Sequence, residues 1–267
     1  MWQETLIQQL RALLLPDAAV KAMVLVGSGA SGRFDAWSDV DALLVVAPEA
    51  YRRFFPSLAW LAPLGEIYAS EQHPGELSAV SRVCLRDMRR FDTIVTTEAA
   101  LARHAEWPSI PFATGSRVIF SRSAVVDAVL AGPFAPPSSP RLTAGEFDAM
   151  ASRFWFKATV AVPQVVRGDL LVALHLNLDL IEDCCVLAMM LRDRATGATH
   201  HRDGVGNDAV AMLEPTRRPH TPVGILDSIE QSAIAFDRLA ARWSDGYQAR
   251  RQPLQVWIAE ARRTVLS

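Results

Sequence analysis

A proline-rich segment divides the chain into two parts with different sequence patterns. Residues 132–140 read GPFAPPSSP, with four prolines in nine positions. Each proline fixes its own φ and lacks a backbone N–H, so such a cluster forms a stiff linker rather than part of a helix or strand. We therefore predict two domains, at residues 1–131 and 143–267, joined by a linker at 132–142.

The residues before this segment predict a small domain of mixed helix and strand. Short apolar runs bounded by glycine, proline or polar residues are typical of buried strands, and apolar residues three or four positions apart are typical of helices. Helices are expected at 3–14, 51–61 and 98–104, and residues 28–38 read as a loop with a helical turn. Strands are expected at 22–27, 40–46, 66–70, 77–85, 91–96 and 117–121.

The residues after the segment predict a helical domain. Long apolar stretches with helical spacing dominate, and residues 195–222 between them are rich in Gly, His, Asp and Pro. The expected fold class is thus α+β, with a small mixed sheet followed by a C-terminal helical bundle. Helices are expected at 144–166, 169–194, 208–213, 224–243 and 254–265.

Composition excludes several classes of function. The net charge is −2 and the pI is near 6.3, which disfavours a protein that binds nucleic acid through its phosphates. No apolar run approaches the roughly 20 residues that span a bilayer, so no membrane partner is expected. The N-terminal MWQETLIQQLRALLL lacks the features of a signal peptide, and we expect a cytoplasmic protein. Three cysteines without metal-binding spacing predict neither a zinc site nor a disulfide framework.

The segment GSGASGRFDAWSDVD at 27–41 contains the residue types expected of a phosphate- and metal-binding site. An apolar strand ends in Gly27-Ser28, where glycine lets a ligand approach the backbone and successive N–H groups with a serine hydroxyl suit a phosphate. After a spacer of ten residues, Asp39 and Asp41 begin the next strand. Side chains two apart on a strand share a face, so these carboxylates stand side by side next to the phosphate site. Such paired oxygen ligands predict Mg²⁺, and two ions would clamp an in-line nucleotidyl transfer.

This segment resembles the signature of the polymerase-β-like nucleotidyltransferases, namely Gly-Ser, a spacer of about ten residues and Asp-x-Asp between two strands. The short sheet domain followed by helices is similar to the aminoglycoside and lincosamide adenylyltransferases. That resemblance implies a third carboxylate on a later strand, for which Asp92 in RRFDTIV is our first candidate and Asp87 the second. Asp92 would be a metal ligand or a general base. Ser38, beside the Asp pair, joins Gly27 and Ser28 as a predicted nucleotide-binding residue.

The helical half offers candidates for contacts with substrates. Lys157 lies in the apolar stretch FWFKATVAV, and only it and Lys21 are lysines among 27 basic residues. A buried ammonium group requires a partner, and the resemblance implies that a lysine on the first long helix reaches the triphosphate. The alternative is a side chain that extends to solvent.

The second long helix predicts an acidic face. His175, Asp179 and Asp183 are four apart, with Glu182 beside them, and these carboxylates are candidates for binding a cationic acceptor. The alternative is a solvated helix face. The segment 200–203 (His-His-Arg-Asp) lacks a further ligand at fixed spacing and reads as a polar loop.

The expected function is Mg²⁺-dependent transfer of a nucleoside monophosphate from an NTP, with ATP as the expected donor, to a hydroxyl group of a small molecule. The acceptor is expected to be an antibiotic that carries amines, with aminoglycosides ahead of lincosamides. Two alternatives stay open: a nucleotidyltransferase that modifies a protein, and a non-catalytic, antitoxin-like protein that binds nucleotide. The sequence leaves the preferred NTP, the modified hydroxyl and the oligomeric state undetermined.

Overall fold

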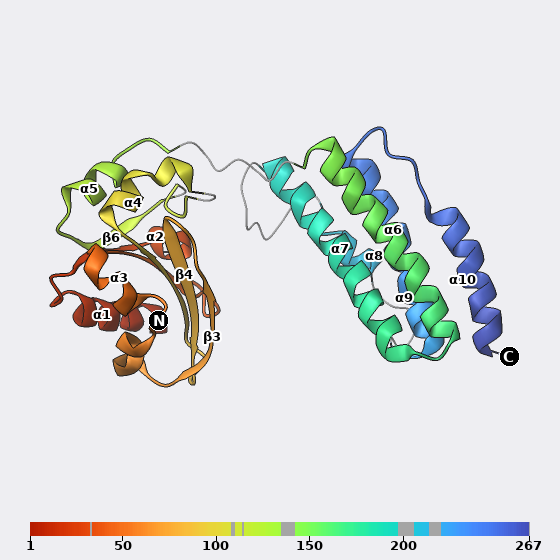
Figure 1. Cartoon of the computed structure of the whole chain (residues 1–267), viewed down its shortest axis with the longest axis horizontal. Coiled ribbons are helices and arrows are strands. Elements are labelled where there is room, and N and C mark those ends of the chain that lie inside the picture. The colour runs from red at the N-terminus through yellow and green to blue at the C-terminus, as the bar shows by residue number, and fades with distance from the viewer. Residues whose placement is uncertain are drawn as a thin grey trace. The chain divides into compact units, whose positions relative to one another are not determined.

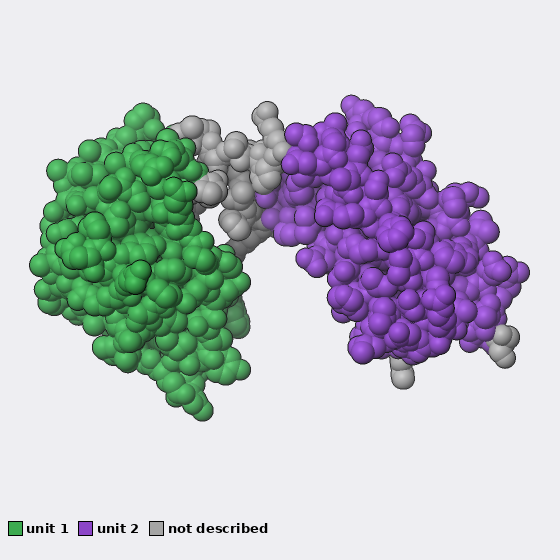
Figure 2. Space-filling view, viewed as in Figure 1, with its two compact units in different colours: residues 1–137 green, residues 138–267 purple. Residues whose placement is uncertain are grey.

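The computed structural model contains two compact units, unit 1 at Met1–Pro137 and unit 2 at Ser138–Ser267 (Figure 2). Most of the predicted linker, at 135–141, lies outside the described residues. Among the described helices, none is long and apolar enough to span a membrane. The structure describes residues 1–32, 34–107, 110–113, 115–134, 142–196, 206–213 and 220–266, with the backbone alone at 195 and 196.

Unit 1 is built on one mixed sheet of six strands in the order β3-β4-β5-β2-β1-β6 (Figure 1). The central pair β2–β5 is parallel, and all the other neighbours are antiparallel. The segment between β2 and β5 contains the β3–β4 hairpin, so β5 returns to lie between β4 and β2. The strands are β1 (Val20–Leu25), β2 (Val40–Val46), β3 (Ile67–His73), β4 (Ser78–Leu85), β5 (Arg90–Thr96) and β6 (Arg117–Ser121).

Helices cover both faces of this sheet. On one face, α1 (Trp2–Leu14) buries its apolar stripe against alternate residues of the strands, which include Met23 of β1 and Leu44 of β2. On the other face, α4 (Glu98–Ala102) and α5 (Ala124–Leu130) pack over the intervening residues of β1 and β2. The period of two along each strand thus divides one apolar run between two cores.

One expected helix differs from the structure. Residues 51–61 were predicted as a single helix, but the chain forms α3 (Tyr51–Phe54) and then the 3-10 helix η2 (Ala59–Leu64). Pro56 accounts for the break, because it cannot donate a helical hydrogen bond and it disfavours helical backbone at the residue before it. The short helix α2 (Gly27–Ser31) is the helical turn expected after β1. The remaining short elements of unit 1 are the 3-10 helices η1 (Pro48–Ala50) and η3 (His104–Glu106).

Unit 2 is helical, which confirms the predicted α+β class with a C-terminal helical part (Figure 1). The first helix starts at a capping box, in which the Thr143 hydroxyl accepts from the Glu146 N–H and the Glu146 carboxylate accepts from the Thr143 N–H. The apolar core of unit 2 includes Phe154 and Phe236, whose ring centroids lie 3.9 Å apart in a stacked arrangement. The helices are α6 (Ala144–Val166), α7 (Leu170–Thr196), α8 (Ala209–Met212), α9 (Pro222–Trp243) and α10 (Arg251–Leu266).

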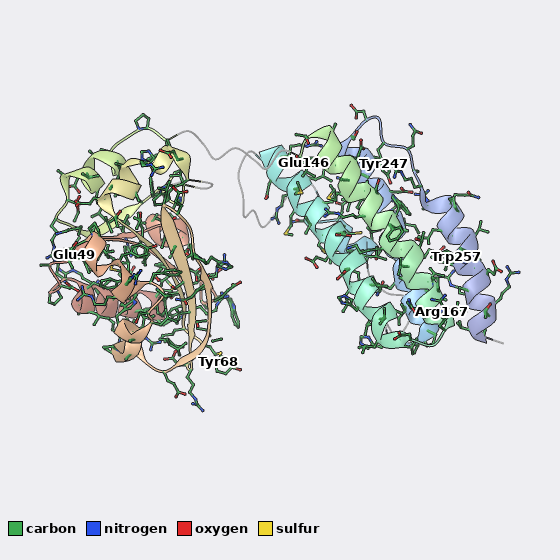
Figure 3. All side chains as sticks on the ribbon, viewed as in Figure 1. Glu49, Tyr68, Glu146, Arg167, Tyr247 and Trp257 are labelled. Carbon is green, nitrogen blue, oxygen red and sulfur yellow. The ribbon has the colours of Figure 1, made fainter. Side chains whose placement is uncertain are left out.

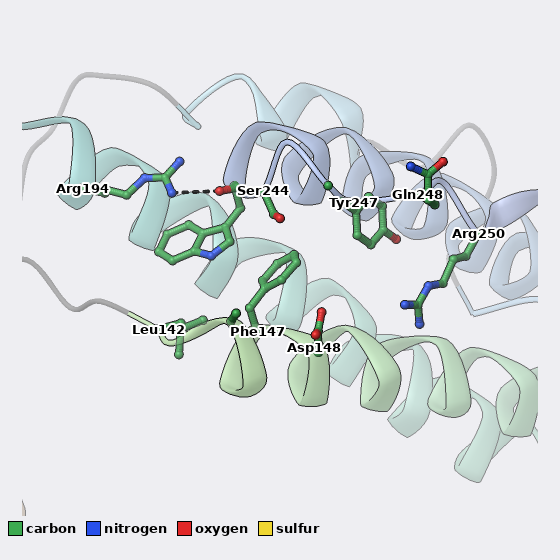
Figure 4. A pocket seen from close by; sticks show the side chains of 11 residues that line it. Leu142, Phe147, Asp148, Arg194, Ser244, Tyr247, Gln248 and Arg250 are labelled. Atoms are coloured by element: carbon green, nitrogen blue, oxygen red, sulfur yellow. Dashed lines mark hydrogen bonds between the residues drawn. The ribbon is translucent and has the colours of Figure 1, made fainter.

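A hydrogen-bonded network joins the loop after α9 to the bundle. Tyr247 of this loop is labelled in Figure 3. The Trp155 indole donates to the Tyr247 hydroxyl at 2.9 Å, and that hydroxyl donates to Asp237 at 2.9 Å. The same loop borders a pocket of about 680 Å³ at one end of the bundle, where Phe147 and Trp243 form an aromatic wall (Figure 4).

Candidate active site

Two of the predicted carboxylates lie beside each other on the central parallel strands. The register of the sheet pairs Asp41 of β2 directly with Asp92 of β5. Residues paired across adjacent strands point to the same face, and this face also carries Leu43. Asp39 immediately precedes β2, and its side chain is 38% exposed. The fold therefore brings together the three carboxylates that were predicted from residues 39–41 and from the strand at 91–96.

A row of charged residues continues from these carboxylates across the sheet. Arg82 of β4 is paired in register with Asp92, and its Nε lies 3.3 Å from Asp92 Oδ2. Glu71 of β3 is paired with Arg82, and its Oε2 lies 3.4 Å from Arg82 Nη1. The Arg82 guanidinium is thus held between two carboxylates.

The carboxylates interact strongly with one another. Burial raises the pKa of Asp41 from 3.8 to about 7, and the charges of Asp39 and Asp92 add to this rise while Arg82 opposes it. Burial and the charge of Asp39 also raise the pKa of Asp92, again against Arg82. Like charges held this close favour any ligand that brings positive charge.

Gly27 places the backbone against this cluster. It adopts φ +57°, and a Cβ built there would lie 2.7 Å from Asp41 Oδ2. Only glycine therefore fits at this position without displacing the carboxylate. Gly27 and Ser28 begin α2, and the first N–H groups of a helix have no acceptors inside it. The predicted phosphate-binding residues thus lie next to the carboxylates.

Ser38 has a different environment from its predicted neighbours. Its hydroxyl donates to Asp35 Oδ1 at 2.9 Å and accepts from the Asp35 N–H at 3.0 Å. The side chain that was predicted to bind nucleotide is therefore used inside the turn that precedes Asp39.

The donors at this site suit a hard cation such as Mg²⁺, because all three side chains offer carboxylate oxygens and two of them have raised pKa values. Within the described part of the chain, no three side chains of Asp, Glu, His or Cys form a group that would hold a metal ion as they stand. The Arg82 contact with Asp92 and the approach of Arg90 Nη2 to 4.0 Å from Asp39 Oδ2 neutralise part of the negative charge.

Asp87, the second candidate for the third carboxylate, lies in the turn between β4 and β5. Its Oδ2 accepts from Arg89 Nε at 2.8 Å, and its side chain is exposed. Asp92 instead lies beside Asp41 in the sheet.

In unit 2, Lys157 and two of the predicted acceptor-binding residues contact one another. Lys157 Nζ lies 2.6 Å from Asp183 Oδ2 and 3.9 Å from Asp179 Oδ2. These carboxylates of α7 face α6, whereas Glu182 and His175 are exposed. The partner that a buried ammonium requires is thus available within the bundle itself. The segment 200–203 lies outside the described residues.

Two residues near the site could not be found from sequence. Arg82 reaches Asp92 only because of the register between β4 and β5, which no local pattern reveals. Gln3 contacts residues 35–38 across a separation of more than 30 positions. A glutamine in the first turn of an amphipathic helix carries no signal of such a contact.

No protein-family model matches this sequence, and no curated protein sequence matches it either. Among solved structures, similarity extends to an aminoglycoside 6-adenyltransferase from Bacillus subtilis, with 15% identity, a TM-score of 0.36, and 99% of this chain and 98% of that chain covered. A spectinomycin adenyltransferase from Enterococcus faecialis, solved with ATP and spectinomycin, has 12% identity, a TM-score of 0.36 and the same coverage of both chains.

A nucleotidyltransferase-like protein from Exiguobacterium sibiricum has 12% identity and a TM-score of 0.31, with 98% of this chain and 90% of that chain covered. Two of these three proteins are thus described as adenyltransferases and the third as nucleotidyltransferase-like.

Proposed function

We propose that this protein transfers a nucleoside monophosphate from an NTP, with ATP as the donor, to a hydroxyl group of a small molecule and releases pyrophosphate. The observation that carries the proposal is the in-register pair of Asp41 and Asp92, with Asp39 on the same face and the Gly27 backbone against Asp41. Three carboxylates that repel one another beside the first N–H groups of α2 suit a metal-bound phosphate chain better than they suit a structural role.

Each residue has a proposed task. Asp39 and Asp41 would hold two Mg²⁺ ions, and Asp92 would act as a further ligand or as the base that accepts the proton of the acceptor hydroxyl. Mg²⁺, when bound, would stabilise the charge that develops on the attacking and leaving oxygens. Gly27 and Ser28 would donate N–H groups to the phosphates.

The proposed roles in unit 2 concern both substrates. Lys157 would contact the triphosphate, and Asp179, Glu182 and Asp183 would attract amine groups of an aminoglycoside-like acceptor. Because Lys157 offsets the charge of its two aspartate neighbours, Glu182 is the carboxylate best suited to bind an ammonium group.

The direct test is an assay of pyrophosphate release with each NTP and Mg²⁺ against a panel of acceptors: aminoglycosides, spectinomycin, lincosamides, neutral polyols and a mixture of proteins. Mass spectrometry of the acceptor should show the added nucleoside monophosphate. If only protein is labelled, the acceptor is a protein rather than a small molecule. If Mg·NTP binds but no acceptor is labelled, the non-catalytic alternative stands.

A further inference from the structure

Asp39 lies outside the hydrogen-bonded part of the sheet, unlike the two carboxylates beside it. Asp41 and Asp92 are held by the ladder between β2 and β5, but β2 begins only at Val40. Another part of the molecule must therefore fix the backbone that carries Asp39.

The turn before Asp39 is closed by its own hydrogen bonds. The Ser38 N–H donates to the Asp35 carbonyl at 3.3 Å, and the Trp37 N–H donates to Asp35 Oδ1 at 2.9 Å. With the bonds between the side chain of Asp35 and that of Ser38, these contacts make residues 35–38 one compact turn. They fix its shape but not its position on the domain.

Gln3 of α1 attaches this turn to the rest of unit 1. Its side chain is fully buried, and its Nε2 donates to the carbonyls of Asp35 at 2.7 Å and Ser38 at 3.0 Å. The Trp2 indole adds a longer bond of 3.4 Å to the carbonyl of Ala36, and Arg90 Nη2 of β5 donates to the Trp37 carbonyl at 3.3 Å. An NH₂ group has two donors, so both are used on the two ends of one turn.

The cost of burying an amide supports a specific role for Gln3. The other buried positions of α1 are apolar, whereas Gln3 buries an amide; an apolar residue at position 3 would leave the Ser38 carbonyl without its donor. The buried amide is therefore explained by what it binds. The Ser38 carbonyl belongs to the peptide group that joins Ser38 to Asp39, so the bond from Gln3 acts one residue away from the carboxylate.

We propose that Gln3 is a positioning residue that fixes Asp39 relative to Asp41. This role rests on the proposed function, since it matters for catalysis only if Asp39 holds a metal ion. A misplacement of about 1 Å at such a site lowers turnover by up to roughly 100-fold.

The test uses Gln3→Met, which keeps length and burial but removes both donors, with Gln8→Met on the exposed side of the same helix as its matched control. Hydrogen exchange should become faster in the peptide that covers residues 34–39. Mn²⁺ affinity, measured by electron paramagnetic resonance, should fall about tenfold. The kcat of pyrophosphate release should fall about 10- to 100-fold, with little change in the KM for ATP. Gln8→Met should change none of these values.

Gln3→Asn, whose amide is one carbon too short to reach both carbonyls, should give the same pattern and serves if Gln3→Met fails to fold. Faster exchange with unchanged Mn²⁺ affinity and kcat would reduce Gln3 to a structural residue and overturn the proposal. Unchanged hydrogen exchange at residues 34–39 would overturn the proposal as well. A wild-type protein that neither binds Mn²⁺ nor releases pyrophosphate would instead overturn the proposed function, and with it this role.

Discussion

The side chain of Asp41 works against the stability of the fold that holds it. Burial and two neighbouring carboxylates raise its pKa to about 7, so near neutral pH the folded protein binds a proton that the unfolded chain has released. A carboxylate kept in such an unfavourable electrostatic environment is typical of a site where function, rather than stability, determines the residue type.

We expect Asp41→Asn to stabilise the metal-free protein at pH 8. A folded-state pKa above the unfolded value of 3.8 means that the free energy of unfolding falls as pH rises from about 4 to about 7. Asparagine removes this loss, so the gain at pH 8 should be up to about 4 kcal/mol and should vanish at pH 4. Thermal melts across that pH range measure it, and the same variant should lose nucleotidyl transfer.

Equal melting temperatures for Asp41→Asn and wild type at every pH would show that Asp41 titrates normally. Added Mg²⁺ provides a second check, because it should raise the melting temperature of the wild type at pH 8 and have little effect on the variant.

Gly27→Ala should lower turnover far more than Gly32→Ala does. Both glycines have positive φ, +57° and +66°, so both variants incur a similar backbone cost of about 1 kcal/mol. The new Cβ at position 27 would also lie 2.7 Å from Asp41 Oδ2, whereas nothing lies within 4 Å of the one at position 32.

We therefore expect the two alanine variants to have melting temperatures within a few degrees of each other, while turnover falls about 100-fold only for Gly27→Ala. Steady-state kinetics of the pair isolates the contact with the carboxylate. Similar turnover in both variants would mean that Asp41 moves aside without consequence.

At the level of single residues, the sequence indicates the chemistry but not its surroundings. Asp39 and Asp41 can be predicted because a local spacing of two on a strand places them on one face. Asp92 requires the further assumption that its strand joins theirs, which the parallel register confirms. Arg82 and Gln3 depend on contacts between distant segments, so no pattern within a window of the sequence contains them.

Among the elements, α6 and α7 share an apolar core and are also joined by the ion pair of Lys157 with Asp183 and Asp179. The sequence predicts both helices, because each has a long apolar pattern, but it does not predict which faces meet. The lysine on one helix and the acidic residues on the next were therefore assigned to two different substrates, although they contact each other.

Lys157→Met should lower the stability of the protein by about 1–2 kcal/mol, because it leaves partly buried carboxylates without their cation. Asp183→Asn should cost a similar amount. If Lys157 also contacts the triphosphate, its loss should weaken the binding of a non-hydrolysable ATP analogue about tenfold, and Asp183→Asn should leave that affinity unchanged. Chemical denaturation and calorimetry of the two variants separate the two roles.

If both variants bind the analogue as the wild type does, Lys157 has only its structural role. Equal weakening in both would show that the ion pair acts by holding the two helices together.

The whole molecule divides into two units with separate apolar cores, which lie on the two faces of the sheet in unit 1 and among the helices in unit 2. We predict that fragments 1–134 and 142–266 fold independently. Each retains its own core, and the described helix at the start of unit 2 carries its own N-terminal cap. Far-UV circular dichroism and cooperative melting of each fragment test this, and a fragment that melts without a transition would show that its core requires the other unit.

The sheet order determines when the site comes into existence during synthesis. Because β5 lies between β4 and β2, a nascent chain that ends before residue 90 has made Asp39 and Asp41 but has nothing to join them to the β3–β4 hairpin. Until β5 emerges, β2 presents an unpaired edge, which is the kind of surface that recruits other chains. The strand that supplies the last carboxylate also closes this edge, so a ribosome that stalls just before it releases a chain that is inactive and prone to aggregation.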